Sequence, residues 1–276
     1  MYNDILRQYP THQILKSGGQ KVVYIVDHPM YGTVVLKVGP TGSPSSLERI
    51  RREVEILSNI SSIYYPKQYS FDIVSRDRFV IIEEYIHSTP LSQCLPSYSN
   101  QSSLLQLMLY LLEGLTILWN NNIIHRDLKP DNILIRPNGL PVIIDLGIAR
   151  PLNLMSLTKT MAPMGPCTPF YAAPEQLWNR KACITHRTDQ FCLGIVAAQL
   201  QLSGKHPFDP AVVGSGDSII MNIINNNWAK DILRNSAQDS FYQIIHRMLS
   251  REPFQRFPSY LDLIFEIAKC KGAANA

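Results

Sequence analysis

Side chains with chemical potential concentrate in one short stretch of the chain. The segment His125-Arg-Asp-Leu-Lys-Pro-Asp-Asn132 brings together acids, cations and an amide, and an apolar run ending in Asp145 follows it. Phosphoryl transfer needs metal ions that offset the phosphate charge, a carboxylate that orients the attacking hydroxyl, and a cation near the transferred group. Asp127 and Lys129 supply the carboxylate and the cation. Asn132 and Asp145 supply hard oxygen ligands of the kind that Mg²⁺ prefers.

The alternative interpretation of this stretch is an ordinary polar surface loop, because loops rich in Asp, Asn and Lys are common. The eight-residue pattern is uninterrupted, however, and the second acidic motif, Asp145-Leu-Gly147, stands downstream of it. Together they resemble the motifs of the protein kinase family. The resemblance implies an α+β, two-lobed fold: a β-rich N-lobe over about 1–85, a hinge over about 84–90, and a mainly helical C-lobe to 276.

The resemblance also implies roles for individual residues. Asp127 is expected to act as catalytic base, Lys129 to lie near the γ-phosphate, and Asn132 and Asp145 to hold Mg²⁺ with ATP. The segment Val35-Leu-Lys37 looks like the family's lysine strand, so Lys37 is expected to reach the α- and β-phosphates. The helical partner of Lys37 is expected to be Glu53, with Glu55 and Glu48 as weaker candidates.

The adenine-binding residues follow from the same resemblance. The strand before Glu84-Tyr-Ile86 is similar to the hinge strand, which implies bonds from the Glu84 carbonyl and the Ile86 amide to the adenine edge. Three apolar residues are expected to enclose the ring: Val23, Val35 and Leu134. Plain core packing is the alternative role for these three, and the two roles can coexist.

Downstream, Thr168-Pro-Phe-Tyr-Ala-Ala-Pro-Glu175 resembles the end of the family's activation segment. Glu175 is then expected to pair with Arg256, and Asp189 to hold the backbone of the catalytic loop. The Lys129-Pro130 pair is the serine/threonine form of the loop, which implies protein substrates with Ser or Thr hydroxyls.

Three positions depart from the family pattern. The glycine-rich loop is reduced to Gly18 and Gly19, whose amides are still expected to cover phosphate. Leu146 replaces a phenylalanine and remains apolar. Glu83 stands at the gatekeeper position behind the adenine, where a carboxylate needs a partner or water.

The elements that must position these residues are predicted from periodicity. Strands are expected over 21–27, 33–38, 70–74 and 78–85, where β-branched and aromatic residues dominate. A helix capped by Ser45 or Ser46 is expected from 47 to about 59, and a second, strongly apolar helix over 103–120. Further helices are expected near 190–202, 218–226 and 241–249.

Composition sets the context. The chain has 276 residues, 45% of them hydrophobic, and a net charge of +4 without a dense basic run, so neither nucleic acid nor membrane is indicated as a partner. The five cysteines form no CxxC pair, and the first ten residues lack the pattern of a signal peptide. These features predict a cytoplasmic protein with reduced thiols. The oligomeric state, the substrate sequence and the pathway are not readable.

Three function classes fit these observations: an active serine/threonine kinase that also phosphorylates itself, a pseudokinase scaffold, and a kinase-like small-molecule phosphotransferase. The reduced glycine loop favours the pseudokinase, whereas the complete set of charged catalytic residues favours the active kinase. The Ala-Pro-Glu segment argues against the small-molecule enzyme.

The activation segment is also expected to carry a switch. Arg126 and Arg150 fall where a phosphorylated residue would find cationic partners, and Ser156, Thr158 and Thr160 lie between them and Thr168. Thr160 is the favoured acceptor. The alternative is that these are ordinary loop hydroxyls and that Arg126 pairs with an acidic side chain or a carbonyl.

Overall fold

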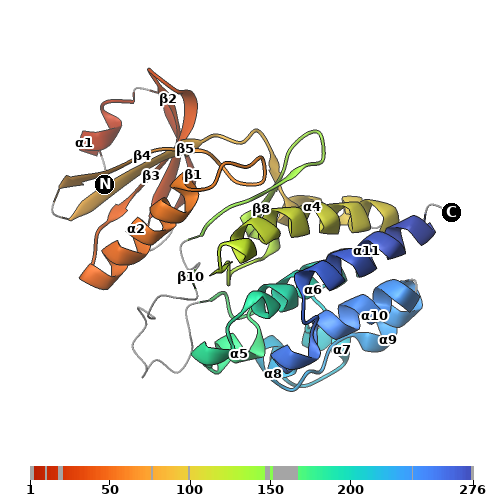
Figure 1. Ribbon diagram of the computed structural model, residues 1–276. Helices are drawn as coiled ribbons and strands as arrows, with labels where there is room; N and C mark the ends of the chain where they lie inside the picture. The colour runs from red at the N-terminus through yellow and green to blue at the C-terminus, as the bar shows by residue number, and fades with distance from the viewer. Residues whose placement is uncertain are drawn as a thin grey trace. The chain divides into compact units, whose positions relative to one another are not determined.

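The computed structural model describes residues 3–9, 11–17, 21–75, 77–98, 100–146, 150–151, 167–237 and 239–274. The chain divides into two compact units, Met1–His87 and Ser88–Ala276. The first is built mainly from strands and the second mainly from helices (Figure 1). Each unit is described by itself.

The first unit is a five-stranded antiparallel sheet in the order β1-β2-β3-β5-β4. Its strands are β1 (His12–Ser17), β2 (Val22–His28), β3 (Gly32–Pro40), β4 (Gln68–Ser75) and β5 (Arg78–Glu84). Alternate residues of the central strands, such as Val34, Leu36 and Val38, are fully buried in a core that also takes in the short helix α1 (Asn3–Leu6). The opposite face of the same strands carries Lys37 and Glu83.

Helix α2 (Pro44–Ser58) belongs to the first unit (Figure 1). Its N-cap is Ser43, whose hydroxyl accepts from the Ser46 amide, so the expected cap at Ser45 or Ser46 is wrong. The helix begins earlier because Pro44 takes the first helical position, where proline needs no amide hydrogen and its fixed φ suits a helix. Glu53, Ile56 and Leu57 form the buried side of α2, and Glu55 is exposed.

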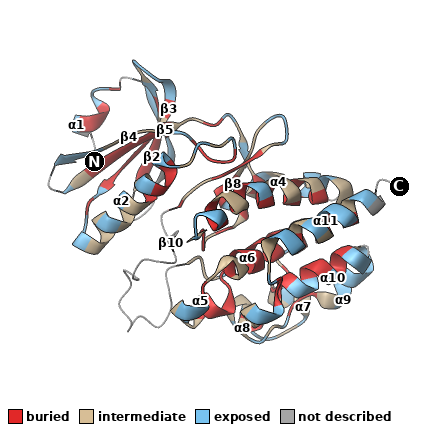
Figure 2. Ribbon diagram, in the orientation of Figure 1, coloured by how far each residue is buried: buried red, intermediate tan, exposed pale blue. Residues whose placement is uncertain are grey.

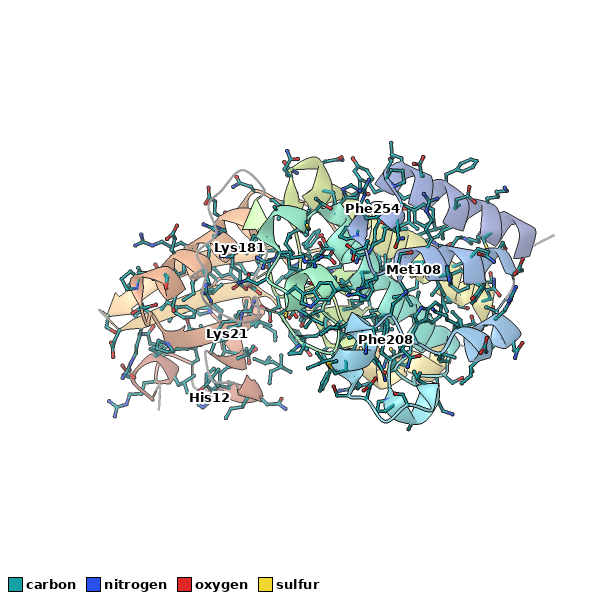
Figure 3. The ribbon with its side chains drawn as sticks, turned by 90° about the horizontal axis from the view of Figure 1, so that it is seen from below. His12, Lys21, Met108, Lys181, Phe208 and Phe254 are labelled. Carbon is teal, nitrogen blue, oxygen red and sulfur yellow. The ribbon has the colours of Figure 1, made fainter. Side chains whose placement is uncertain are left out.

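The second unit is organised around helix α4 (Gln101–Asn120), which has Asn100 as N-cap. Figure 2 shows buried residues along α4 and along α6 (His186–Gln201), and α11 (Tyr260–Ala274) runs beside α4. Helices α8 (Ile219–Ile224), α9 (Lys230–Ser236) and α10 (Asp239–Met248) complete the main helical part. Met108 and Phe208 lie inside this unit (Figure 3), and neither side chain is exposed.

Short helical elements connect these parts of the second unit. They are α3 (Leu91–Cys94), α5 (Pro174–Leu177), α7 (Pro210–Val213) and the 3₁₀ turns Leu95–Tyr98, Pro130–Asn132, Lys181–Cys183 and Pro253–Gln255.

Small strands carry the loops that matter for chemistry. β6 (Thr89–Pro90), β8 (Ile133–Ile135) and β9 (Pro141–Ile143) form one antiparallel sheet, and β7 (Ile123–Ile124) pairs with β10 (Arg150–Pro151). The loop 125–129 therefore begins at the end of β7 and leads through a 3₁₀ turn into β8.

Among the described residues, α4 is the one helix long and apolar enough to cross a membrane by length and composition. More than half of its apolar window is buried inside the protein. Packing against α6, α11 and β9 explains that apolarity without a membrane.

Candidate active site

One carboxylate holds the backbone of the loop 125–129 in the second unit. Asp189, the fourth residue of α6, is fully buried and accepts three hydrogen bonds. The backbone amides of His125 and Arg126 donate to it at 2.9 and 2.8 Å, and the Trp119 indole donates at 2.9 Å. From the sequence, Asp189 was expected to hold this backbone, although the individual amides were not named. The contribution of Trp119 was not expected, because in α4 it reads as one more apolar residue.

The Asp127 carboxylate has several donors around it. Its Oδ1 accepts from the Thr168 amide at 3.0 Å, and its Oδ2 accepts from Lys129 Nζ at 2.7 Å and from the Asn132 amide nitrogen at 3.1 Å. Lys129 Nζ also donates to the Thr168 hydroxyl. Asp127, Lys129, Asn132 and Thr168 thus converge on one point of the second unit, and the carboxylate is fixed in orientation.

Asn132 and Asp145 are brought to the same end of the β8–β9 pair. Ile133 pairs with Ile143, and the Ile144 amide donates to the Asn132 carbonyl at 2.9 Å, so Asp145 follows directly. The nitrogen of the Asn132 side chain is used by Asp127, and its oxygen is the atom suited to a hard cation. Carboxylate and amide oxygens are ligands that suit Mg²⁺. No cluster of three or more His, Cys, Asp or Glu side chains suited to a metal occurs among the described residues. Asn132 is not one of these residue types, so it does not count toward such a cluster. Asp145 and Asn132 alone do not fill the coordination sphere of Mg²⁺, so phosphate oxygens and water would complete it.

Two loop residues have left-handed backbone conformations. Arg126 has φ +71° and Asp145 has φ +67°, a region that non-glycine residues rarely adopt. Such conformations persist only where surrounding contacts impose them. At Arg126 these contacts include the Asp189 bond to its amide and the Gln176 side chain, which donates to its carbonyl at 2.8 Å.

A buried ion pair anchors the segment after Thr168. Glu175 and Arg256 are fully buried and joined by two bonds of 2.7 and 2.9 Å. Thr188 Oγ1 adds a third bond to Glu175, and Arg256 also donates to three backbone carbonyls. The pairing is the one expected from the sequence.

His206 joins the same segment to the loop before α7. One ring nitrogen lies 3.0 Å from the Phe170 carbonyl, and the other accepts from the Phe208 amide at 3.2 Å. Burial lowers the pKa of His206 to about 4, although the Phe170 carbonyl acts in the opposite direction.

The Cys167 thiol lies just before Thr168 in the chain. Burial raises the pKa of this thiol to about 11, and Asp127 adds to the effect. This thiol is therefore protonated and unreactive at neutral pH.

The first unit carries the lysine, and its closest partner is not the expected one. Lys37 Nζ lies 2.7 Å from Glu83 Oε1 and 3.7 Å from Glu53 Oε1, so the hydrogen bond goes to Glu83. Glu53 in turn accepts from Lys21 at 3.3 Å. The carboxylate that the sequence placed at the gatekeeper position has Lys37 as its partner.

The remaining residues expected at the nucleotide site are distributed over both units. Val23 and Val35 lie on the same sheet face as Lys37, since Val23 pairs with Lys37 across β2–β3 and Val35 with Glu83 across β3–β5. Glu84 ends β5, Ile86 is buried, and Leu134 lies half-buried on β8. Gly18, Gly19, Ser156, Thr158, Thr160 and the Arg150 side chain lie outside the described residues.

Comparison with known proteins decides the family. The protein kinase domain family matches residues 9–264. The chain belongs to the protein kinase family.

Relatives among bacterial kinases agree with this membership. The chain is 27% identical over 261 residues to the serine/threonine-protein kinase PknA of Corynebacterium glutamicum, covering 91% of this chain and 53% of that protein. It is 26% identical over 272 residues to the serine/threonine-protein kinase PrkC of Bacillus subtilis, covering 94% and 40%. It is 30% identical over 214 residues to the serine/threonine-protein kinase PknA of Mycobacterium tuberculosis, covering 73% of this chain and 48% of that protein. The chain thus spans about half the length, or less, of these relatives.

Proposed function

We propose that this member of the protein kinase family is an active serine/threonine kinase, which transfers the γ-phosphate of ATP to protein hydroxyls with Mg²⁺. The observation that carries the proposal is the Asp127 carboxylate, held by Thr168, Lys129 and Asn132 in a loop that Asp189 fixes. A carboxylate with this much support is oriented before substrate binds, and such preorganisation is a large part of catalysis of phosphoryl transfer.

In the proposed reaction, Asp127 orients the substrate hydroxyl and takes up its proton, and Lys129 stabilises charge on the transferred phosphoryl group. Lys37 binds the α- and β-phosphates. Bound Mg²⁺ would neutralise phosphate charge, with Asp145 and the Asn132 oxygen as its protein ligands. The family membership supports ATP and protein substrates in general, and the serine/threonine relatives support the choice of hydroxyl.

The test is a phosphate-transfer assay with radiolabelled ATP, run with a generic protein substrate and with small alcohols. Label on protein Ser and Thr, lost in Asp127→Asn, is the expected result. Nucleotide binding without transfer would favour the pseudokinase scaffold, and label on a small alcohol alone would favour the small-molecule phosphotransferase. The intact Glu175–Arg256 pair, which ends a protein kinase activation segment, supports the first outcome.

We also propose that the enzyme phosphorylates its own activation segment at Ser156, Thr158 or Thr160, with Thr160 favoured. The supporting feature is Arg126, a largely buried cation beside the catalytic carboxylate, which can form charge-assisted bonds to a phosphate. Mass spectrometry after incubation with Mg·ATP detects the modification. If a variant with alanine at Ser156, Thr158 and Thr160 keeps full kinase activity, the proposed switch is refuted and the kinase assignment stands. The cytoplasmic location remains a prediction, which cell fractionation tests.

A further inference from the structure

Four charged side chains of the first unit form one cluster, and three of them are buried. They come from different elements: Lys21 precedes β2, Lys37 lies on β3, Glu53 on α2 and Glu83 on β5. The exposed fractions of the Lys37, Glu53 and Glu83 side chains are 10%, 5% and 4%, and that of Lys21 is 24% (Figure 3 labels Lys21). The cluster holds two positive and two negative charges, so it is neutral as a whole.

The sheet register fixes the contact between Lys37 and Glu83. Lys37 pairs with Ile81 across β3–β5, and Glu83 lies two residues further along β5, on the same face. Diagonal neighbours of this kind are within reach of long side chains. Both partners sit on paired strands of the central sheet, so their backbone positions relative to each other are set by the hydrogen bonds of the ladder.

The contact with Glu53 is different in kind. At 3.7 Å, Lys37 and Glu53 form an ion pair without a hydrogen bond, whereas Lys37 and Glu83 at 2.7 Å form a short, charge-assisted one. Glu53 has its own closer cation, Lys21. Removing the cation bound to a buried carboxylate is strongly unfavourable. Because the Lys37–Glu83 bond is the shorter one, these two residues depend on each other more than either depends on Glu53.

From this arrangement we infer that Glu83 is a positioning residue for Lys37: it holds the ammonium group on the sheet, and Glu53 is the secondary partner. An ammonium has three N–H donors, so Lys37 can keep its bond to Glu83 and still donate to phosphate oxygens. The helix α2 carries Glu53, whereas β5 carries Glu83, so the lysine is anchored by the sheet itself. The role at the phosphates rests on the proposed function; the role of Glu83 toward Lys37 does not.

The first experiment needs no nucleotide. Thermal unfolding is measured for the wild-type chain, Glu83→Gln, Lys37→Met and the double variant. Glu83→Gln should lower the Tm by several degrees when Lys37 is present. In the Lys37→Met background it should raise the Tm, because Glu83 is then a buried carboxylate without its cation. An equal shift of the Tm in both backgrounds would mean that Glu83 only fills space, and would overturn the inference.

The second experiment measures the affinity for Mg·ADP by calorimetry. Glu83→Gln should weaken binding about 10-fold, equivalent to about 1.4 kcal/mol, and Glu53→Gln should weaken it less. In the Lys37→Met background Glu83→Gln should have no further effect. Glu55→Gln, exposed on the same helix as Glu53, is the matched control and should bind as the wild type does.

Failure of this inference and failure of the proposed function give different results. Tighter or unchanged binding in Glu83→Gln, or a larger loss in Glu53→Gln, would show that Glu83 does not position the lysine. Glu83→Met, an apolar side chain of similar length, replaces Glu83→Gln if the latter does not fold. A chain that binds Mg·ADP with these effects but transfers no phosphate would refute the proposed function and leave this inference standing.

Discussion

At the scale of single residues, the site depends on groups whose hydrogen bonds leave little freedom. The Asp127 carboxylate accepts from an amide, an ammonium and a side-chain amide within 3.1 Å. Asp127→Asn keeps the shape and removes the charge. It should therefore preserve the fold and nucleotide affinity while lowering turnover roughly 10²–10⁴-fold, the usual range for loss of a general base. Initial rates at saturating ATP measure this. The control is Asp131→Asn in the same loop, which is exposed and should retain activity; equal rates in the two variants would remove Asp127 from the mechanism.

Asp145 should contribute to Mg²⁺ binding rather than to activation of the substrate hydroxyl. Asp145→Ala removes the carboxylate at the end of β9, and we expect the Mg²⁺-dependent part of the nucleotide affinity to disappear. Calorimetry with ATP, with and without Mg²⁺, separates that part from the rest. If the variant kept the full Mg²⁺ effect, the cation would bind elsewhere in the chain.

At the scale of elements, α4, α6 and the catalytic loop meet at Asp189. The Trp119 indole is a donor from α4, so Trp119→Phe retains the ring and deletes one bond to a fully buried carboxylate. The expected loss is about 1–3 kcal/mol of the free energy of unfolding, with reduced turnover because the loop is less firmly held. Urea denaturation and initial rates check both. A variant as stable as the wild type would mean that the two backbone amides suffice.

His206 makes a loop contact sensitive to acid. Its pKa in the folded chain is about 4, below the ordinary value of 6.5, so the unfolded chain binds a proton that the folded chain excludes. The free energy of unfolding should therefore fall as the pH drops from about 6.5 to about 4, by up to about 3 kcal/mol from this group. Denaturation of the wild type and of His206→Gln at pH 7 and pH 4.5 tests this. His186 and His246, whose pKa values are also lowered by burial, act in the same direction in both proteins. The variant should be less stable at pH 7 yet lose less stability on acidification, and an identical loss would exclude His206 as the cause.

Elements differed in how far the sequence could predict them. β2, β3, β5 and α4 carry clear apolar patterns and were expected within a few residues. β1 was missed because it is an edge strand whose apolar residues, Ile14 and Leu15, are 60% and 56% exposed. α11 was also missed, although Leu263, Ile267 and Cys270 recur at helical spacing and are buried. The lysine partner Glu83 could not be predicted, since a diagonal contact depends on strand register, which one sequence leaves open.

At the scale of the whole molecule, each unit has its own buried charges, and the helical unit depends on Glu175 and Arg256. The pair is 81 residues apart in sequence and has no access to water. Glu175→Gln leaves the Arg256 guanidinium without its carboxylate, which costs roughly 3–5 kcal/mol. For a chain of this size the Tm should fall by about 10 °C.

Glu252→Gln is the matched control for the Glu175 variant. Glu252 lies on the surface near Arg180 and Arg251, at 3.7 and 3.9 Å, and exposed pairs of this kind contribute at most about 1 kcal/mol. The Tm of the Glu252→Gln variant should stay within a few degrees of that of the wild type. Equal shifts in the two variants would contradict the structural importance of the buried pair.

The left-handed backbone at Asp145 has a consequence for engineering. Among the described residues, the other left-handed positions outside glycine are mostly asparagine, which tolerates this conformation as aspartate does. Aspartate tolerates the conformation at Asp145 but keeps part of its steric cost, which glycine removes. Heat selection without an activity requirement would thus favour glycine at this position. Under the proposed role of Asp145 as a metal ligand, the selected variants would be folded and would lose Mg²⁺ binding.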